Sequence, residues 1–263
     1  MKFTFDAYFD LLHCLRRKGY VFTDYRSCLD APLPPRCVIL RHDIDFSLSD
    51  AVSLSEREGN EGIPSFWFIL LKTDFYNPFT TENVRKLRLL QKNGGSIGLH
   101  FDESQYAEQL LPLLENGAEE EYRNRLTQLV RSEIDLLSGL LGTAVQAVSM
   151  HCPSAEFLKR EVEFPGIVNA YGRTFFRDFK YLSDSSRHWR EDVERIVSEG
   201  AYPRLQILTH AFWYGETETG LKERLLRFCR SASRERYASL KENFNGLHEV
   251  LQLGEVCEND GGS

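Results

Sequence analysis

The chain has 263 residues and a mass of 30.4 kDa, which is enough to bury one sizeable hydrophobic core. Its content of 42% hydrophobic and 27% charged residues is ordinary for a soluble globular protein, and its net charge of −7 argues against nucleic acid as a partner. The first residues lack the apolar run of a signal peptide, and no apolar run is long enough to span a membrane. The six cysteines show no Cys-x-x-Cys spacing, so we expect reduced thiols in a cytoplasmic protein.

Helix-like and strand-like segments alternate along the chain. Apolar residues at helical spacing from Phe5 to Lys18, followed by Gly19, predict a first helix. Strands are predicted at 37–43, 63–71, 96–101, 144–150, 166–171, 179–183 and 204–211. Further helices are predicted near 48–59, 81–92, 104–115, 118–141, 154–161, 189–199 and 218–242. Such alternation favours a parallel α/β architecture, either a barrel or a doubly wound sheet.

The segment from Cys37 to Ser47 reads as a buried strand that stops at charged groups. Residues two apart share one face of an extended chain, so Asp43 and Asp45 are placed to converge on one site. The alternative is that both are surface acids at the end of a strand.

Three later strands end in the same way. His100 and Asp102 close the strand that follows a Gly-Gly turn, His151 closes the next strand, and His210 closes the last. One histidine at the end of a strand is weak evidence, but four strands that end in Asp or His indicate a common site. These residue types are the ligands and acid–base groups of a divalent metal centre.

Two further residues are candidates for substrate contact. Trp213 lies at a strand end beside His210, where an amphipathic ring lines a pocket or only packs in the core. Asp184 follows another strand, where its carboxylate contacts substrate hydroxyls or caps the helix near Trp189.

Four short segments together resemble the motifs of one known family. They are Leu-Arg-His-Asp-Ile-Asp at 40–45, Ile-Gly-Leu-His at 97–100, Ser-Met-His-Cys-Pro at 149–153 and Leu-Thr-His at 208–210. In this order they are similar to the motifs of the polysaccharide deacetylases of carbohydrate esterase family 4, the NodB-homology domains. The chain looks closest to the divergent WbmS-like group of bacterial surface-polysaccharide gene clusters.

The resemblance implies a fold and a division of the chain. The family fold is α/β, an incomplete (β/α) barrel of about seven parallel strands in a single domain. It would place an N-terminal helix and lead-in at 1–36, the barrel at 37–254 and a flexible tail at 255–263.

The resemblance also implies a chemistry. Asp43 would be the general base, Asp45 and His100 metal ligands, and His210 the general acid. The cofactor would be a divalent metal, Zn²⁺ first, with Ni²⁺, Co²⁺ or Mn²⁺ as alternatives. The reaction would remove an N-acetyl group from a sugar in intracellular surface-glycan biosynthesis. The substrate would be an N-acetylated sugar, a nucleotide sugar or a lipid-linked glycan.

One departure from the family concerns the metal. Ser104 stands where the second motif has a further metal-binding histidine. We predict His151 as the third ligand, because histidine is a common zinc ligand and His151 closes a neighbouring strand. Asp102 is the alternative ligand, and its other expected roles are to cap the next helix or to bind substrate.

A second departure concerns the general base. Cys152 stands where the third motif has an arginine. Asp43 therefore lacks its usual positive neighbour unless Arg41, which is also a candidate for substrate binding, or another group takes that place. Two alternatives follow: a catalytically silent carbohydrate-binding barrel, and an amidohydrolase acting on a non-sugar amide or a formyl group.

Overall fold

The computed structural model of the chain describes residues 1–30 and 32–256. These residues divide into two compact units, one from Met1 to Glu216 and one that begins at Thr217. The tail predicted at 255–263 falls almost entirely on residues 257–263, outside the described part of the chain.

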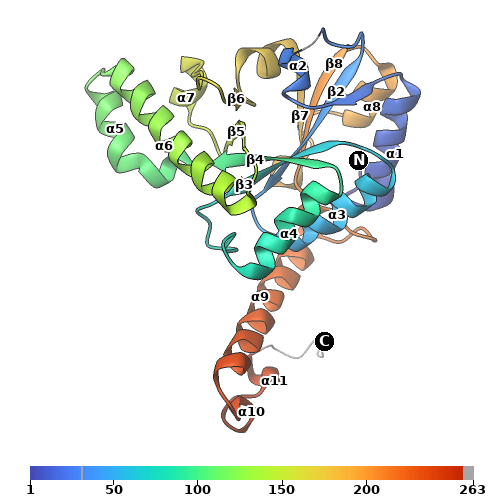
Figure 1. Cartoon of the computed structure of the whole chain (residues 1–263). Helices are drawn as coiled ribbons and strands as arrows, with labels where there is room; N and C mark the ends of the chain where they lie inside the picture. The colour runs from blue at the N-terminus through green and yellow to red at the C-terminus, as the bar shows by residue number, and fades with distance from the viewer. Residues whose placement is uncertain (31, 257–263) are drawn as a thin grey trace. The chain divides into compact units, whose positions relative to one another are not determined.

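A sheet of parallel strands forms the centre of the first unit (Figure 1). Its strands are β1 (Val21–Thr23), β2 (Cys37–Ile44), β3 (Ser65–Leu70), β4 (Gly95–Phe101), β5 (Ala147–Met150), β6 (Val168–Asn169), β7 (Lys180–Ser183) and β8 (Arg204–Thr209). Seven of them follow the order β6-β5-β4-β3-β2-β8-β7, and β1 pairs with the start of β2. The seven curl into a half-barrel, and no pairing joins β6 to β7 in the described residues. The predicted incomplete (β/α) barrel is confirmed.

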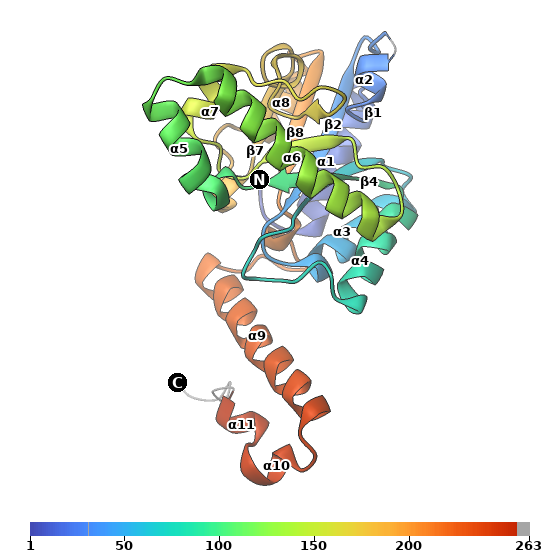
Figure 2. The same cartoon turned by 60° about the vertical axis from the view of Figure 1, so that its left-hand side comes forward.

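Helices cover the outside of this half-barrel. They are α1 (Phe5–Arg17), α2 (Ser27–Asp30), α3 (Leu48–Asn60), α4 (Thr81–Lys92), α5 (Ala107–Glu115), α6 (Glu119–Leu141), α7 (Ala155–Arg160) and α8 (Val193–Glu199). α3 packs on α4, α4 and α6 pack on β4, and α1 packs on α8. Figure 2 shows α5 and α6 side by side. Five of these helices begin at side-chain caps, in which Thr4, Ser47, Thr80, Ser154 and Asp192 accept backbone N–H groups.

Four short helical turns and the second unit complete the described chain. The turns are η1 (Glu103–Tyr106), η2 (Thr174–Asp178), η3 (Ser185–Arg187) and η4 (Ala211–Trp213). The second unit contains α9 (Leu221–Asn243), α10 (Leu247–Val250) and α11 (Leu253–Val256). No described helix combines the length and the apolar character needed to cross a membrane.

The strand register assigns alternate residues of β2 to the two faces of the sheet. Arg41 pairs with Phe66 and Asp43 with Phe68, and laterally paired residues share a face. These residues line the interior of the half-barrel. Its lower part is filled by an apolar cluster, Tyr25, Cys28, Cys37, Ile39, Phe66, Phe68, Ala147, Ala170, Phe175 and Phe179. The charged end of β2 therefore packs on the aromatic side chains of this cluster, which we call the aromatic floor.

Gly98 of β4 allows that floor to pack. It pairs with Phe68 and so faces the interior. A Cβ atom at this position would lie 2.5 Å from Phe68 Cε1 and 2.8 Å from Phe66 Cε1, closer than real side-chain contacts. Glycine is required here because the two phenyl rings occupy the space of a side chain.

His42 faces the helices and not the barrel interior, although it lies between Arg41 and Asp43. Its Nε2 lies 3.0 Å from Glu58 Oε1 of α3, and its Nδ1 lies 2.7 Å from Thr209 Oγ1 of β8. The Tyr8 hydroxyl of α1 donates to the same Glu58 oxygen at 2.5 Å. His42 therefore links helix α3 to strand β8 through its two ring nitrogens.

Candidate metal centre

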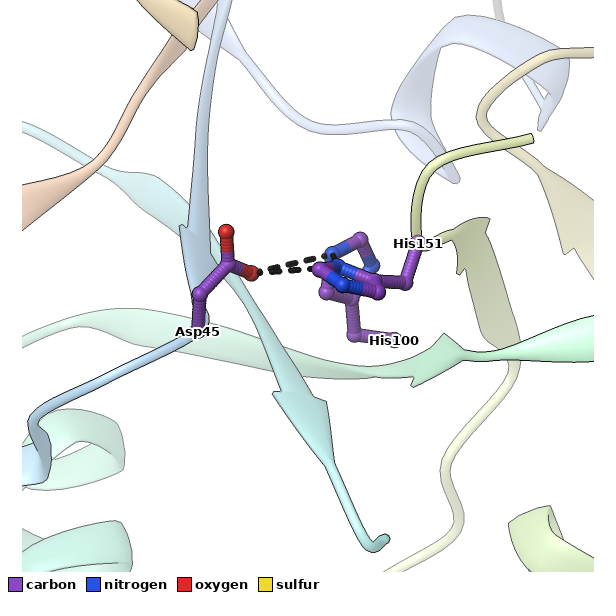
Figure 3. A group of neighbouring side chains, drawn as sticks. All are labelled: Asp45, His100 and His151. Carbon is purple, nitrogen blue, oxygen red and sulfur yellow. Dashed lines mark hydrogen bonds and ion pairs between the residues drawn. The ribbon is translucent and has the colours of Figure 1, made fainter. Parts of the chain in front are cut away.

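Asp45, His100 and His151 come together at the carboxyl ends of β2, β4 and β5. Their ligand atoms all lie within 4.8 Å of one another. Asp45 Oδ1 is 3.3 Å from His100 Nε2 and 3.4 Å from His151 Nδ1, and the two imidazole nitrogens are 3.2 Å apart. Figure 3 shows the Asp45 carboxylate pointing at the two rings from the opposite side. His151, predicted from the sequence as the third ligand, thus lies beside Asp45 and His100.

The three ligand atoms have the spacing that a small cation requires. Zinc binds imidazole and carboxylate at about 2.0–2.2 Å, so two ligand atoms of a tetrahedral site lie about 3.3–3.5 Å apart. Asp45 Oδ1 is buried and forms no well-directed hydrogen bond among the described residues. Burial would raise the pKa of this carboxyl, but the two imidazoles hold it well below its usual value. One carboxylate and two imidazoles therefore fit a divalent metal.

A sharp turn after β5 places His151. Its backbone N–H donates to Phe101 O at 2.8 Å, which extends the pairing of β4 and β5 by one residue. Cys152 then adopts a left-handed conformation with φ of 43°, unusual for a residue with a side chain. Ser154 caps α7 directly afterwards. The chain therefore turns directly after His151, and the His151 imidazole lies at the carboxyl ends of the strands.

Asp102, the alternative ligand, caps the turn η1. Its carboxylate accepts from Ser104 N at 3.0 Å, from Ser104 Oγ at 2.7 Å and from Gln105 Nε2 at 3.2 Å. Ser104, which the sequence excluded as a ligand, is exposed. The cluster of possible ligands contains His151 and not Asp102.

Arg41 and Asp43 form a buried ion pair directly below the cluster. Arg41 Nε and Nη2 donate to the two oxygens of Asp43 at 2.9 and 2.7 Å, and Arg41 is fully buried. Ser149 Oγ and, at 3.4 Å, Tyr171 Oη accept from the same guanidinium. Burial would raise the pKa of Asp43, but Arg41 and nearby imidazoles hold it below its usual value. Asp43 thus has a positive neighbour, supplied from its own strand.

His210 forms a second charged pair on the other side. Its Nδ1 lies 2.6 Å from Asp184 Oδ1, and its Nε2 lies 3.6 Å from Asp45 Oδ2. The backbone N–H of His210 and the hydroxyl of Tyr214 donate to Asp184 Oδ2 at 3.2 and 3.0 Å. Burial would lower the pKa of His210, but Asp184 raises it to about 9. The pairing with Asp184 therefore favours the protonated form of His210.

Asp184 differs from both roles considered from the sequence. Its side chain makes no helix-capping hydrogen bond, and the residue is fully buried. Both carboxylate oxygens are occupied by His210 and Tyr214, which leaves no free face for a substrate hydroxyl. The sequence offered no sign of this pairing, because 26 residues separate Asp184 from His210.

Trp213 belongs to an aromatic wall beside His210. Its ring centroid lies 6.5 Å from that of His210, 4.9 Å from Phe212 and 5.7 Å from Phe46. Only 6% of Trp213 is exposed, and its Nε1 has no hydrogen-bond partner in the described part of the chain. Trp213 thus packs against the neighbouring aromatic rings, and its indole N–H has no acceptor among the described residues.

A cavity of about 570 Å³ opens elsewhere, near the amino ends of β4, β5 and β6. Gly95, Ser96, Ala147 and Val168 are among its lining residues. None of the charged residues at the carboxyl ends of the strands contributes to it. This cavity is therefore separate from the candidate metal centre.

No family model matches this chain, and no curated protein does. Among solved structures, the chain is similar to the deacetylase PplD of Streptococcus pyogenes in complex with acetate. The two are 15% identical and superpose with a TM-score of 0.38. The match covers 53% of this chain and 58% of that chain, so it spans little more than half of either. Function is therefore inferred from the site itself.

Proposed function

We propose that the chain is a metal-dependent hydrolase that removes the acetyl group from the nitrogen of an N-acetylated sugar. The observation that carries this proposal is the meeting of Asp45, His100 and His151 at ligand spacing. Asp43 and His210 flank this cluster on opposite sides, as a base and an acid for amide hydrolysis would.

Asp43 is the general base. The Oδ2 atom of Asp43 lies 3.5 Å from His100 Nε2, at the edge of the cluster. A divalent ion bound there supplies Lewis acidity, which makes a carbonyl more electrophilic and water more acidic. Because Arg41 keeps Asp43 ionised, its carboxylate is ready to accept a proton from water. Arg41 donates from Nε and Nη2 to the two oxygens of Asp43 and is a positioning residue.

His210 is the general acid. An amide nitrogen leaves only when it is protonated, so the reaction needs a proton donor on the side of the leaving group. Asp184 holds Nδ1 of the ring and favours its charged form, which directs the proton on Nε2 toward the cluster. The Arg41–Asp43 pair thus provides an anionic base, and the Asp184–His210 pair provides a cationic acid.

The choice of a sugar rests on the aromatic wall. Phe46 is half-buried and packs on Trp213, whose ring centroid lies 6.5 Å from that of His210, and we propose that the apolar face of a sugar ring packs on Phe46. Substrates would be N-acetylated sugars, nucleotide sugars or lipid-linked glycans of surface-glycan biosynthesis. A non-sugar amide or a formyl group would use the same residues. The spacing of the three ligand atoms supports this enzyme over a silent barrel.

Acetate release tests the proposal. Purified protein, stripped of metal and then supplied with Zn²⁺, Ni²⁺, Co²⁺ or Mn²⁺, is incubated with N-acetylated sugars, sugar nucleotides and non-sugar amides. We expect acetate release from a sugar, its loss with a chelator and its return with metal. Asp43→Asn and His210→Ala should each lower turnover by about 10²–10⁴-fold.

Asp10→Asn is a matched control, because Asp10 is exposed on α1. This variant should keep full turnover. Near-normal turnover of Asp43→Asn, or no hydrolysis of any sugar by metal-loaded protein, would contradict the proposal.

A further inference from the structure

Glu103 joins the two segments that follow the histidines of the candidate metal centre. It lies in the turn η1, three residues after His100 of β4. The carboxylate of Glu103 is half-buried, and its Oε1 accepts from the backbone N–H of Ser154 at 2.6 Å. Ser154 lies three residues after His151. One carboxylate therefore links the exit of β4 to the exit of β5, directly beyond the two histidines.

This hydrogen bond replaces one that a helix often makes within itself. Ser154 is the N-cap of α7, and its hydroxyl accepts from Phe157 N at 3.0 Å. In a capping box, the backbone N–H of the N-cap residue donates to a Glu or Gln side chain three residues later. That position of α7 is Phe157, which has no side-chain acceptor, and Glu103 of another element accepts instead. The start of α7 is thus fixed to η1.

The turn between His151 and Ser154 depends on bonds from outside. Cys152 has a φ of 43°, a conformation that a residue with a side chain keeps only where surrounding contacts maintain it. The backbone N–H of His151 donates to Phe101 O at 2.8 Å at the start of the turn, and Glu103 accepts from Ser154 at its end. Both partners belong to the segment that continues from His100. The turn is therefore held at both ends by β4 and η1.

Glu103 is itself held in place. Asp102 orders the turn η1 by accepting from Ser104 N at 3.0 Å and from Ser104 Oγ at 2.7 Å. The hydroxyl of Tyr122, a fully buried residue of α6, lies 3.5 Å from Glu103 Oε2. Burial raises the pKa of the Tyr122 phenol, so it stays a neutral donor. The carboxylate that accepts from Ser154 is thus fixed by two neighbouring elements.

We propose that Glu103 is a positioning residue that holds His151 at ligand distance from Asp45 and His100. This inference rests on the proposed function, because it takes these three residues as the metal ligands. His151 Nδ1 lies 3.2 Å from His100 Nε2 and 3.4 Å from Asp45 Oδ1. Ligands that are placed before the metal arrives bind it more tightly, because little ordering is then required on binding. Glu103 is not among the residues whose ligand atoms cluster, so its effect passes through His151.

Zinc affinity tests the proposal without any substrate. Glu103→Met keeps the length of the side chain but removes the acceptor, and it should raise the dissociation constant of Zn²⁺ about 10–100-fold. Glu103→Gln should stay within about threefold of the parent, because its side-chain oxygen still accepts from the Ser154 N–H. Competition with a chelator measures these constants, and far-UV circular dichroism shows whether each variant is folded.

Glu119→Met is the matched control. Glu119 of α6 accepts from Arg160 Nε at 2.9 Å and from Arg160 Nη2 at 2.8 Å, so it fastens the other end of α7. Glu103→Met and Glu119→Met should both lower the thermal midpoint of the metal-free protein, but Glu119→Met should keep the zinc affinity of the parent. This comparison separates a general loosening of α7 from the placement of His151.

Parent-like zinc affinity in Glu103→Met would overturn the proposal. So would an equal loss of affinity in Glu103→Met and Glu103→Gln, or in Glu103→Met and Glu119→Met. These results would leave the proposed function standing as long as the parent chain binds Zn²⁺. A parent chain that binds no Zn²⁺ would instead overturn the proposed function together with this inference.

Discussion

At the scale of single residues, neighbours decide what each charged group of the site does. Asp43 and Asp184 are both buried carboxylates, but Asp43 is paired with a permanent cation and Asp184 with a titratable one. The first arrangement yields an anionic base, and the second yields an imidazolium. Residue type alone would assign the same role to both acids.

His151→Ala should yield metal-poor protein. One of three protein ligands is lost, and this should weaken binding by more than the roughly 10–100-fold that loss of a supporting residue costs. Metal content after dialysis and the dissociation constant of Zn²⁺ from competition with a chelator would measure the effect.

Ser104→Ala is the control for this prediction. Its hydroxyl bonds to Asp102 outside the cluster, so metal affinity should stay within a few-fold of the parent. Full metal occupancy in His151→Ala, or loss of metal in Ser104→Ala, would show that the ligand set is different.

Asp184→Asn should lower the pKa of His210. The negative charge of Asp184 raises that pKa to about 9, so its removal favours the neutral ring. An opposite charge at this distance shifts a pKa by about 1–3 units, and the titration should move to lower pH by that amount. Nuclear magnetic resonance titration of the metal-free protein measures it directly.

The same change predicts a kinetic effect. If His210 must be protonated to act, activity falls as pH rises through its pKa, and this alkaline limb should move to lower pH in Asp184→Asn. Tyr8→Phe is a control, because it removes a buried hydrogen bond to Glu58 on the helix side of the sheet. An unchanged His210 titration in Asp184→Asn would refute the electrostatic role of Asp184.

At the scale of elements, the register of the parallel strands places polar side chains at the carboxyl ends of the strands and aromatic side chains deeper in the half-barrel. β2, β3 and β4 are aligned so that Asp43, Phe68 and Gly98 lie side by side on the inner face. The base of the proposed enzyme therefore stands beside the ring whose packing requires a glycine. The candidate site and the hydrophobic core thus contain neighbouring residues of the same strands on the same face of the sheet.

Gly98→Ala should destabilise the fold by about 1–3 kcal/mol. The new methyl group would lie 2.5 Å from Phe68 Cε1, and overpacking of a closed core has this cost. Urea denaturation would measure the free energy of unfolding.

Gly139→Ala is the opposite case on α6. A Cβ atom at Gly139 meets nothing within 4 Å, so alanine should raise the free energy of unfolding by about 0.5–1 kcal/mol. Equal free energies of unfolding for the two alanine variants would contradict the packing of the floor.

At the scale of the whole molecule, the two units differ in what holds them together. The first unit contains every buried hydrophobic residue of the described chain, and the helices α9, α10 and α11 contain none. Helices without a core open locally at little cost in free energy.

Limited trypsin digestion should therefore cut first within the second unit. Arg227 and Arg234 are exposed sites on α9. We expect a resistant product that contains residues 1–216 and keeps a cooperative thermal transition, identified by mass spectrometry and circular dichroism. Early cleavage between β2 and β8 would contradict this division.

The sequence by itself determined the order and type of the longer elements, and it singled out the residues that lie together in the candidate metal centre. Apolar runs that end in Asp or His were enough to place Asp45, His100, His151 and His210 at one edge of a sheet, because parallel strands point the same way. It missed β1 and α2, the turns η2, η3 and η4, and the short helices α10 and α11, because these elements are too short to show a period.

Only the tertiary structure decided which residues become partners. The pairing of β8 with both β2 and β7 brings His210 to Asp184, and the curl of the sheet brings Ser149 and Tyr171 to Arg41. The periodicity of apolar residues along a chain indicates which face of a helix or strand each residue occupies. Contacts between distant segments depend on the order of the strands in the sheet, and no local sequence pattern specifies that order. The charge states of the proposed base and acid arise from those contacts and so appear only in the folded protein.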